Sequence, residues 1–441
     1  MSHLGREVLR RVLAGEGTAP EADRAEEHLV SCETCRAQAA TLLDELRVAR
    51  PELRGEDSLR LVFDLIDRER RRGVEDLAAL AEWAELRRIS SRRSQRDRVR
   101  MTKACHTIAF FNLLLRELKE AAAWEEAEFV ASLAVLSCER MSQRQQVSEP
   151  SKNDLLAEVW TAVANSRRRA AEWGKAHQAL TFAERYLKSG TGDPRLEASL
   201  LSIGASTLAD EGHVREAVEA LDRCGQIYQG LTEWPLLART LIQKANILAG
   251  TEPVQGLSAL DHALPFIPAG DPRLLLFAEM LRVECLIEVR KPVEALQVFR
   301  RSSHLLDETP QIRPRIRGRF TSARLLDALG FQQHAERLFD EVVARDIEHE
   351  LYKDALLDLL YLYGRHVKTG EFEKAAGVCT RALTDASLAE ITHDQIRDLW
   401  TQLLNAAQVH AISQDVLKDL RRYLNVHWKQ PAAQPPVVRL R

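Results

Sequence analysis

The feature of this sequence that most constrains the fold is a pattern that returns about every forty residues. A small residue is followed four positions later by a mostly apolar residue, and seven positions later by another small or apolar residue. The six clear copies begin at Ala176, Ala217, Gly256, Ala295, Ala335 and Ala375, at successive spacings of 41, 39, 39, 40 and 40 residues. Weaker copies begin at Ala79 and Ala127. Because positions i, i+4 and i+7 share one helix face, the pattern predicts stacked helices in close contact.

Turn residues between the copies predict where the helices end and begin. Gly212, Gly330 and Gly370 lie about five residues before a copy, where glycine ends one helix and allows a tight turn into the next. The Asp-Pro dipeptides at 193–194 and 271–272 have the residues of a helix start, an N-cap followed by proline. Each unit is therefore expected to contain a helix, a turn, a second helix and a short loop.

The segment Thr-Gly-Glu-Phe-Glu-Lys-Ala-Ala at 369–376 resembles the second half of a tetratricopeptide repeat (TPR). The resemblance covers residues 155–410 well and 58–154 less well, and the period exceeds the usual repeat of about 34 residues. It implies an all-α solenoid whose concave groove, in most relatives, holds a peptide, a helix or another protein. The alternative is a passive spacer or a dimerisation surface.

Composition agrees with a packed helical chain. Apolar residues make up 45% and charged residues 29% of 441 residues, with 20 glycines and 15 prolines. The net charge of -3 predicts no general affinity for nucleic acid or anionic membranes. No apolar run is long enough for a membrane span and no signal peptide is evident, so we expect a cytoplasmic protein. Five of seven cysteines occur singly in helical patterns and are expected to be buried.

A different motif lies before the repeats. His28, Cys32 and Cys35 form a His-x3-Cys-x2-Cys pattern, in which one helical turn and a Cys-x-x-Cys hairpin can direct three ligands to one ion. Tetrahedral zinc requires a fourth ligand, and His3 is the best candidate. The apolar stripe Leu4, Val8, Leu9 and Val12 predicts a first helix; Gly15 to Gly17 breaks it, and the capping box at 18–21 opens a second. Such a hairpin would bring His3 towards the other three residues.

With His3 separated from His28 by 24 residues, the segment resembles the zinc-binding anti-sigma domains of bacterial regulators. The resemblance covers residues 1–46. It implies a helical bundle stapled by Zn²⁺ that, with a following helix, clamps a sigma factor. A redox-active Cys-x-x-Cys pair and two incidental cysteines are the alternatives to zinc. The redox interpretation is disfavoured because no strand-then-helix pattern surrounds the motif.

The expected organisation therefore has five parts: a zinc-binding bundle at 1–46, a linker at 47–57, irregular helical repeats at 58–154, a TPR-like solenoid at 155–425 and a flexible Pro-rich tail at 426–441.

Residues 58–70 are interpreted as an amphipathic helix. It is either one that wraps a partner or the first helix of the first repeat, with Gly73 and Ala79 following at repeat spacing. The arginine-rich stretch 87–100 is interpreted as a solvated or partner-facing helix in preference to a nucleic-acid site, because it contains no aromatic residue.

No catalytic constellation is evident in the sequence, and we expect a non-enzymatic protein. His349 and Glu350 begin like a metalloprotease helix, but Lys353 occupies the place of the second ligand. The leading hypothesis is a bacterial regulatory adaptor, in which the zinc module binds a sigma factor and the solenoid groove binds another protein or a peptide. The alternative is a scaffold subunit of a multiprotein complex, of defence type for example, with a purely structural zinc site.

Overall fold

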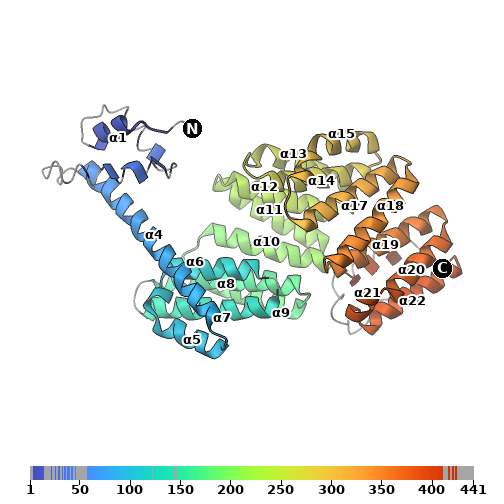
Figure 1. The fold of residues 1–441 in the computed structure, drawn as a ribbon, viewed down its shortest axis with the longest axis horizontal. Coiled ribbons are helices and arrows are strands. Elements are labelled where there is room, and N and C mark those ends of the chain that lie inside the picture. The colour runs from blue at the N-terminus through green and yellow to red at the C-terminus, as the bar shows by residue number, and fades with distance from the viewer. Residues whose placement is uncertain are drawn as a thin grey trace. The chain divides into compact units, whose positions relative to one another are not determined.

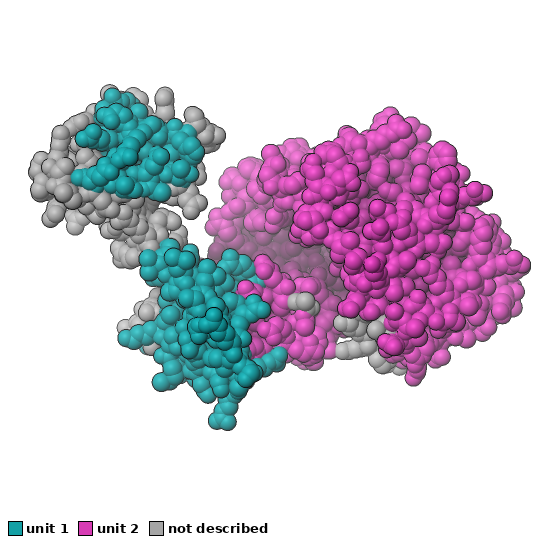
Figure 2. Space-filling view, viewed as in Figure 1, with its two compact units in different colours: residues 1–116, 136–144 teal, residues 117–135, 145–441 magenta. Residues whose placement is uncertain are grey.

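The computed structural model describes most of the chain. The described residues are 3–13, 21, 25, 28–29, 32, 34–35, 37–39, 41–42, 45, 57–121, 123–143, 147–410, 416–417, 420–421 and 423–424, with the side chains of 57–72 and 391 outside the description. The chain divides into two compact units, residues 1–116 with 136–144 and residues 117–135 with 145–441 (Figure 2). The predicted linker, except Asp57, the predicted tail and the proposed capping box, except Glu21, lie outside the described residues.

The first unit begins with helix α1 (Arg6–Leu13). It continues with α4 (Asp57–Arg88), α5 (Arg92–Met101) and the short 3-10 turn η2 (Lys103–Cys105), while α6 (Ile108–Glu120) and α7 (Trp124–Gln143) are divided between the units. Residues 58–70 do not form a separate helix that ends before Gly73, because α4 is one continuous helix of 32 residues through Gly73. An isolated glycine inside a helix costs only about 1 kcal/mol relative to alanine, which a long helix tolerates.

The second unit is a succession of antiparallel helix pairs, as Figure 1 shows. Its helices are α8 (Glu149–Arg169), α9 (Trp173–Lys188), α10 (Pro194–Asp210), α11 (Val214–Gly230), α12 (Trp234–Leu248), α13 (Pro253–Ala263), η3 (Leu264–Phe266), α14 (Pro272–Glu288), α15 (Pro292–Ser302), α16 (His304–Asp307), α17 (Ile312–Ala328), α18 (Gln332–Glu348), α19 (Tyr352–Thr369), α20 (Phe372–Thr384), α21 (Ala386–Ile391) and α22 (Asp394–Gln408). The fold is all-α in the described residues, as predicted.

The repeated triplet marks the buried face of the second helix of each pair. All six first residues, from Ala176 to Ala375, are buried, as are the other triplet residues except Leu180 and Phe299, which are partly buried. At Gly256, a Cβ atom would lie 3.2 Å from the Cys285 sulfur. The small first residue therefore allows the close helix approach that the spacing predicted.

The tight turns within the pairs share one backbone conformation. Gly212, Gly330 and Gly370 have φ angles of 89°, 89° and 78°, the left-handed region that glycine enters without steric cost. Arg290 and His410 adopt it as well, with φ of 60° and 54°, so the turns at 290, 330, 370 and 410 recur every 40 residues. A glycine search misses two of these four turns because the turn geometry, not the residue type, is what repeats.

The predicted Asp-Pro helix starts are confirmed. Asp193 accepts a hydrogen bond from the Arg195 amide at 2.9 Å, and Asp271 accepts one from the Leu274 amide at 3.0 Å. Such N-caps satisfy amides that would otherwise lack a partner at the helix end. Among the described helices, none combines the length and apolar character needed to cross a bilayer.

Candidate functional site

The four predicted metal ligands lie together in the first unit. His3 precedes α1, and His28, Cys32 and Cys35 come from the following segment, whose described residues are helical except Cys32. One ligand atom of each of the four residues lies within 4.8 Å of a ligand atom of each of the other three. The Nδ1 atom of His3 is 3.3 Å from the Cys32 sulfur and 3.6 Å from the Cys35 sulfur. The structure therefore brings together residues that are up to 32 positions apart.

A small apolar core holds this arrangement in place. Its buried side chains are Leu9, Leu13, Leu29, Cys35, Ala39 and Leu42, with Leu4 packed against them. The amide of Leu4 donates to the Cys35 sulfur at 3.3 Å, and the amide of Cys32 donates to the His28 carbonyl at 2.8 Å. Of the predicted stripe, Leu9 is in this core and Leu4 packs against it from before α1, whereas Val8 and Val12 are half-buried; Leu13, which was not predicted, completes the inward face. Cys35 is fully buried, whereas His3 is exposed.

The two thiols have different acidities. The backbone N–H of Cys35 donates to Cys32 and, with smaller contributions from His3, Cys35 and His28, lowers the pKa of Cys32 to about 6. Burial raises the pKa of Cys35, although the Leu4 amide opposes this shift. A thiolate at neutral pH is the form that binds metal. At neutral pH, Cys32 is therefore largely in the thiolate form that binds a metal cation.

The donor set fits tetrahedral zinc. Two imidazole nitrogens and two sulfurs match a common structural zinc site, and bond lengths of about 2.3 Å to sulfur and about 2.0–2.1 Å to nitrogen place tetrahedral N and S ligands roughly 3.5 Å apart. The two His3–sulfur distances of 3.3 and 3.6 Å bracket that value. These residues could hold the ion with little movement.

A second group of potential ligands, Glu336, His366 and Glu371, is better described as an ion-pair network. Lys374 lies 2.8 Å from Glu336 and 2.7 Å from Glu371, and Arg365 lies 3.3 Å from Glu336. Hydrogen bonds from Lys374 and His366 lower the pKa of Glu371 to about 2. The carboxylates are already neutralised by side chains, so we do not assign a cation here.

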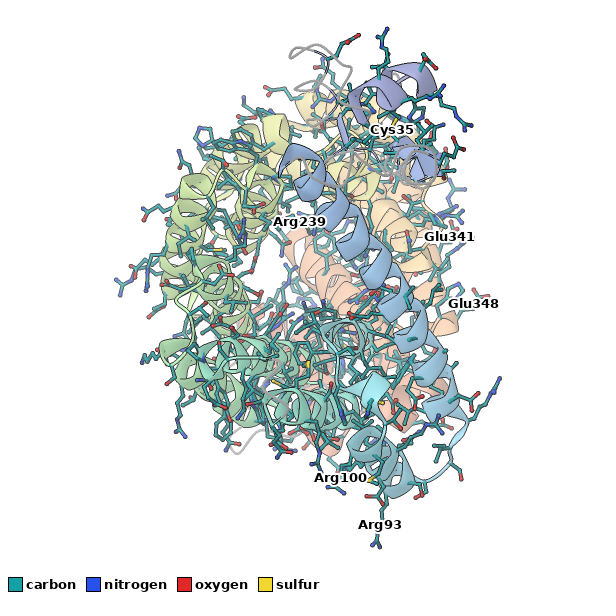
Figure 3. All side chains as sticks on the ribbon, turned by 90° about the vertical axis from the view of Figure 1, so that its left-hand side faces the viewer. Cys35, Arg93, Arg100, Arg239, Glu341 and Glu348 are labelled. Carbon is teal, nitrogen blue, oxygen red and sulfur yellow. The ribbon has the colours of Figure 1, made fainter. Side chains whose placement is uncertain are left out.

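The arginine-rich stretch spans the end of α4 and all of α5. Arg98 pairs with Glu82, and Arg100 lies 2.8 Å from Asp97. Arg93 and Arg100 extend from α5 in Figure 3. Part of the positive charge is therefore neutralised within the first unit, which agrees with a solvated helix.

The interior of the second unit contains three adjoining cavities of about 850, 780 and 610 Å³. They share Asn246 of α12, Glu284 of α14 and Arg421 near the C-terminus, and Arg239, labelled in Figure 3, lines the first of them. The remaining walls come mainly from α14, α17 and α19. These are the first helices of successive pairs, so their inner faces form one continuous groove, here called the interior groove.

Ion pairs between these inner helices line the interior groove at nearly the period of the repeat. Arg313 of α17 lies 2.8 Å from Asp354 of α19, and Arg317 lies 2.8 Å from Asp358, each pair 41 residues apart. Arg324 of α17 pairs in the other direction, with Glu284 of α14 at 3.3 Å. Positions about forty residues apart face each other on neighbouring units, so charge complementarity helps to set the register of the stack.

The carboxyl groups of Asp346 and Asp358 form a buried pair, of which Asp358 contacts Arg317. Asp346 of α18 is fully buried, and burial, reinforced by the charges of Asp358 and Asp354, raises its pKa to about 8. Burial also raises the pKa of Asp358, against the attraction of Arg317. One proton shared by Asp346 and Asp358 is the arrangement that avoids two buried negative charges side by side.

The metal ligands are recognisable in the sequence, whereas the residues of the interior groove are not. Arg317, Arg324 and Asp358 lie in ordinary charged helical stretches, with no motif around them. A search for opposite charges about forty residues apart would have found several of the pairs once the period was known.

Comparison with known proteins identifies the fold but no family. No protein-family model matches the chain, and a search of curated proteins finds no match. Among solved structures, the chain is similar to a Rap protein complexed with Competence and Sporulation Factor, at 17% identity and a TM-score of 0.51, over 71% of this chain and 87% of that one. The similarity shows that the chain shares the all-α helical-repeat fold of that Rap protein.

Proposed function

We propose that this protein is a non-enzymatic, cytoplasmic regulatory adaptor with two binding modules. The observation that carries the proposal is the presence, in one chain, of a four-ligand metal cluster and of a solenoid with a wide interior groove. The Rap protein of similar fold was solved with a bound factor, and helical solenoids generally bind partners on their concave surface. The solenoid is proposed to bind a segment of a partner protein or a peptide in this groove.

The N-terminal module is proposed to bind Zn²⁺ through His3, His28, Cys32 and Cys35 and, in its folded form, to bind a sigma factor. The resemblance to anti-sigma domains and the fit of the donor set to zinc support this assignment. Binding at the groove would alter the affinity of the zinc module for its target by linkage between two sites on one chain. We therefore expect a regulated, reversible inhibitor of transcription initiation.

The test is co-purification of the full-length protein from its native host, with metal analysis of the same preparation. Zinc at one equivalent per chain and a sigma factor in repeated pull-downs are expected. A Cys32→Ser/Cys35→Ser variant should lose both, while a His177→Ala variant, altered at an exposed histidine of the solenoid, should keep both. Zinc without any sigma factor would contradict the anti-sigma function and leave the zinc site standing.

A scaffold subunit with a purely structural zinc site is the second candidate. It is favoured by the burial of Cys35 within the bundle's own core, which ties the metal to folding. In that case the double cysteine variant should unfold the N-terminal segment without changing the transcription of any target gene.

A further inference from the structure

Some cationic side chains of the interior groove pair with a carboxylate, whereas others have none at ion-pair distance within the described residues. Arg313, Arg317 and Arg324 each form an ion pair across adjacent helices. The 780 Å³ cavity is also lined by cations for which no carboxylate lies at ion-pair distance within the described part of the chain: Arg290, Lys353, Lys368 and Arg421. The wall is thus neutralised at the paired arginines and left positive at the unpaired side chains.

The charge of Lys353 is held at an energetic cost. Burial lowers the pKa of Lys353, and Asp210 and Asp354 offset this only in part. Arg421 is exposed to the groove, and partial desolvation together with the positive charges of Arg324 and Arg317 lowers its pKa. A cation removed from water without a partner destabilises the folded chain. An anion entering the cavity would remove that cost, so the wall favours a negatively charged occupant.

The net charge of the walls of the first and second cavities is positive as well. Cationic side chains outnumber acidic ones among the residues that line the first and the second cavities, although the whole chain carries a net charge of -3. A positive recess in an otherwise slightly negative protein attracts acidic ligands and disfavours basic ones. Cavities of 850 and 780 Å³ are of the size that encloses a few amino-acid residues.

Arg421 is held by a firmly packed segment of the chain. Leu417, Leu420 and Leu424 belong to the same core cluster as α19, α20 and α22. The Tyr423 hydroxyl donates to the Gln395 side chain of α22 at 2.6 Å. The C-terminal segment therefore supplies a positioned charge to the groove and is more than a cap on the last helix pair.

We propose that the interior groove binds an acidic peptide segment, whose carboxylates pair with Lys353 of α19 and Arg421 of the C-terminal segment. The inference rests on the proposed function of the groove and names the chemistry of its ligand. Arg313, Arg317 and Arg324 are already paired, so the unpaired cations of the wall, Lys353 and Arg421 among them, set the preference for negative charge.

The test measures fluorescence anisotropy of the full-length protein with three fluorescein-labelled decapeptides of Ser and Gly that carry alternating Glu, Gln or Lys. The Glu peptide should bind at least tenfold more tightly than the Gln peptide, with a strong salt dependence. Arg421→Ala and Lys353→Met should each weaken it about tenfold, the effect of losing one charged partner. Arg215→Ala, at an exposed arginine of α11 that lines none of the three cavities, is the matched control and should not alter binding.

Thermal unfolding of the same variants separates binding from folding. Because Lys353 is desolvated without a partner, Lys353→Met should leave the melting temperature unchanged or raise it while peptide binding falls. Loss of binding that follows a lowered melting temperature in both variants would overturn the assignment. Arg421→Glu adds a second check, since it should shift preference towards the Lys peptide.

The outcomes of the binding experiment distinguish the acidic preference from the proposed role of the groove as a peptide site. Equal binding of all three peptides would overturn the acidic preference and keep the groove as a peptide site. Binding of none of them at millimolar concentration would overturn both. Full displacement of the Glu peptide by equimolar inorganic phosphate would show a site for free anions and would overturn the peptide assignment.

Discussion

The N-terminal bundle and the solenoid differ in how their folded structures are stabilised. The bundle has a core of a few side chains around Leu9 and Cys35, too small to stabilise a fold without a staple. The solenoid repeats one interface about every forty residues and adds ion pairs between inner helices. Stability in the first depends on one site, whereas in the second it is distributed over many. A single change should therefore have an all-or-none effect in the bundle and a graded effect in the solenoid.

The largest expected effect is loss of the bundle when the metal is removed. Structural zinc contributes on the order of 10 kcal/mol to the folding of small modules, more than this core can replace. Treatment with a chelator, or Cys35→Ser, should abolish hydrogen-exchange protection in residues 3–45 and leave that of residues 149–410 intact. Equal protection of the bundle with and without metal would remove the distinction between the two regions.

Within the solenoid, Phe339→Ala should cost about 3–5 kcal/mol, the usual result of a large cavity. Phe339 is 1% exposed and packs against Phe320 and Tyr361, with ring centroids 5.5 Å away in each case. Chemical denaturation should show the lower stability. Phe331→Ala, at an exposed phenylalanine immediately before α18, should change stability by less than about 1 kcal/mol. A similar loss at both positions would mean that burial does not govern the effect.

The buried carboxyl pair predicts a pH dependence that belongs to the solenoid. The folded-state pKa of Asp346 is raised to about 8, above its unfolded value near 3.8. The contribution of Asp346 to the free energy of unfolding is therefore fully present below pH 4. It is lost as the pH rises towards 8, by at most about 1.4 kcal/mol per pH unit. Asp346→Asn should flatten the dependence of unfolding free energy on pH between 5 and 8. An unchanged slope would show that Asp346 is not the titrating group.

The smallest expected effect concerns one tight turn. Arg290 has a left-handed conformation that costs an L-residue roughly 1–2 kcal/mol, and glycine does not incur this cost. Arg290→Gly should raise the unfolding free energy by about 1 kcal/mol, whereas Gly330→Ala at the equivalent turn should lower it by a similar amount. Matched melting curves would check the opposite signs, and two changes of the same sign would refute the equivalence of the turns.

Local signals made much of this molecule predictable. The triplets, the turn glycines and the Asp-Pro caps all depend on neighbouring residues, and the structure confirms them. The metal ligands were recognisable because their spacing is itself local, with only His3 distant. Gly73 misled because one glycine does not end a helix that is otherwise well supported. The position of Arg421 in the groove depends on how distant helices pack together, which no short stretch of sequence determines.

The burial of the solitary cysteines gives the protein a built-in reporter. Cys105, Cys138, Cys224, Cys285 and Cys379 are all fully buried, as expected from the sequence. Burial raises the pKa of Cys105, Cys285 and Cys379 to about 12, so their thiols are protonated and slow to react. Alkylation of the native protein by a maleimide would therefore begin at Cys32, whose pKa is lowered to about 6, because the buried Cys35 is protected in the same way as the other five. A simple mass shift would then report, chain by chain, whether the N-terminal site is occupied inside a living cell.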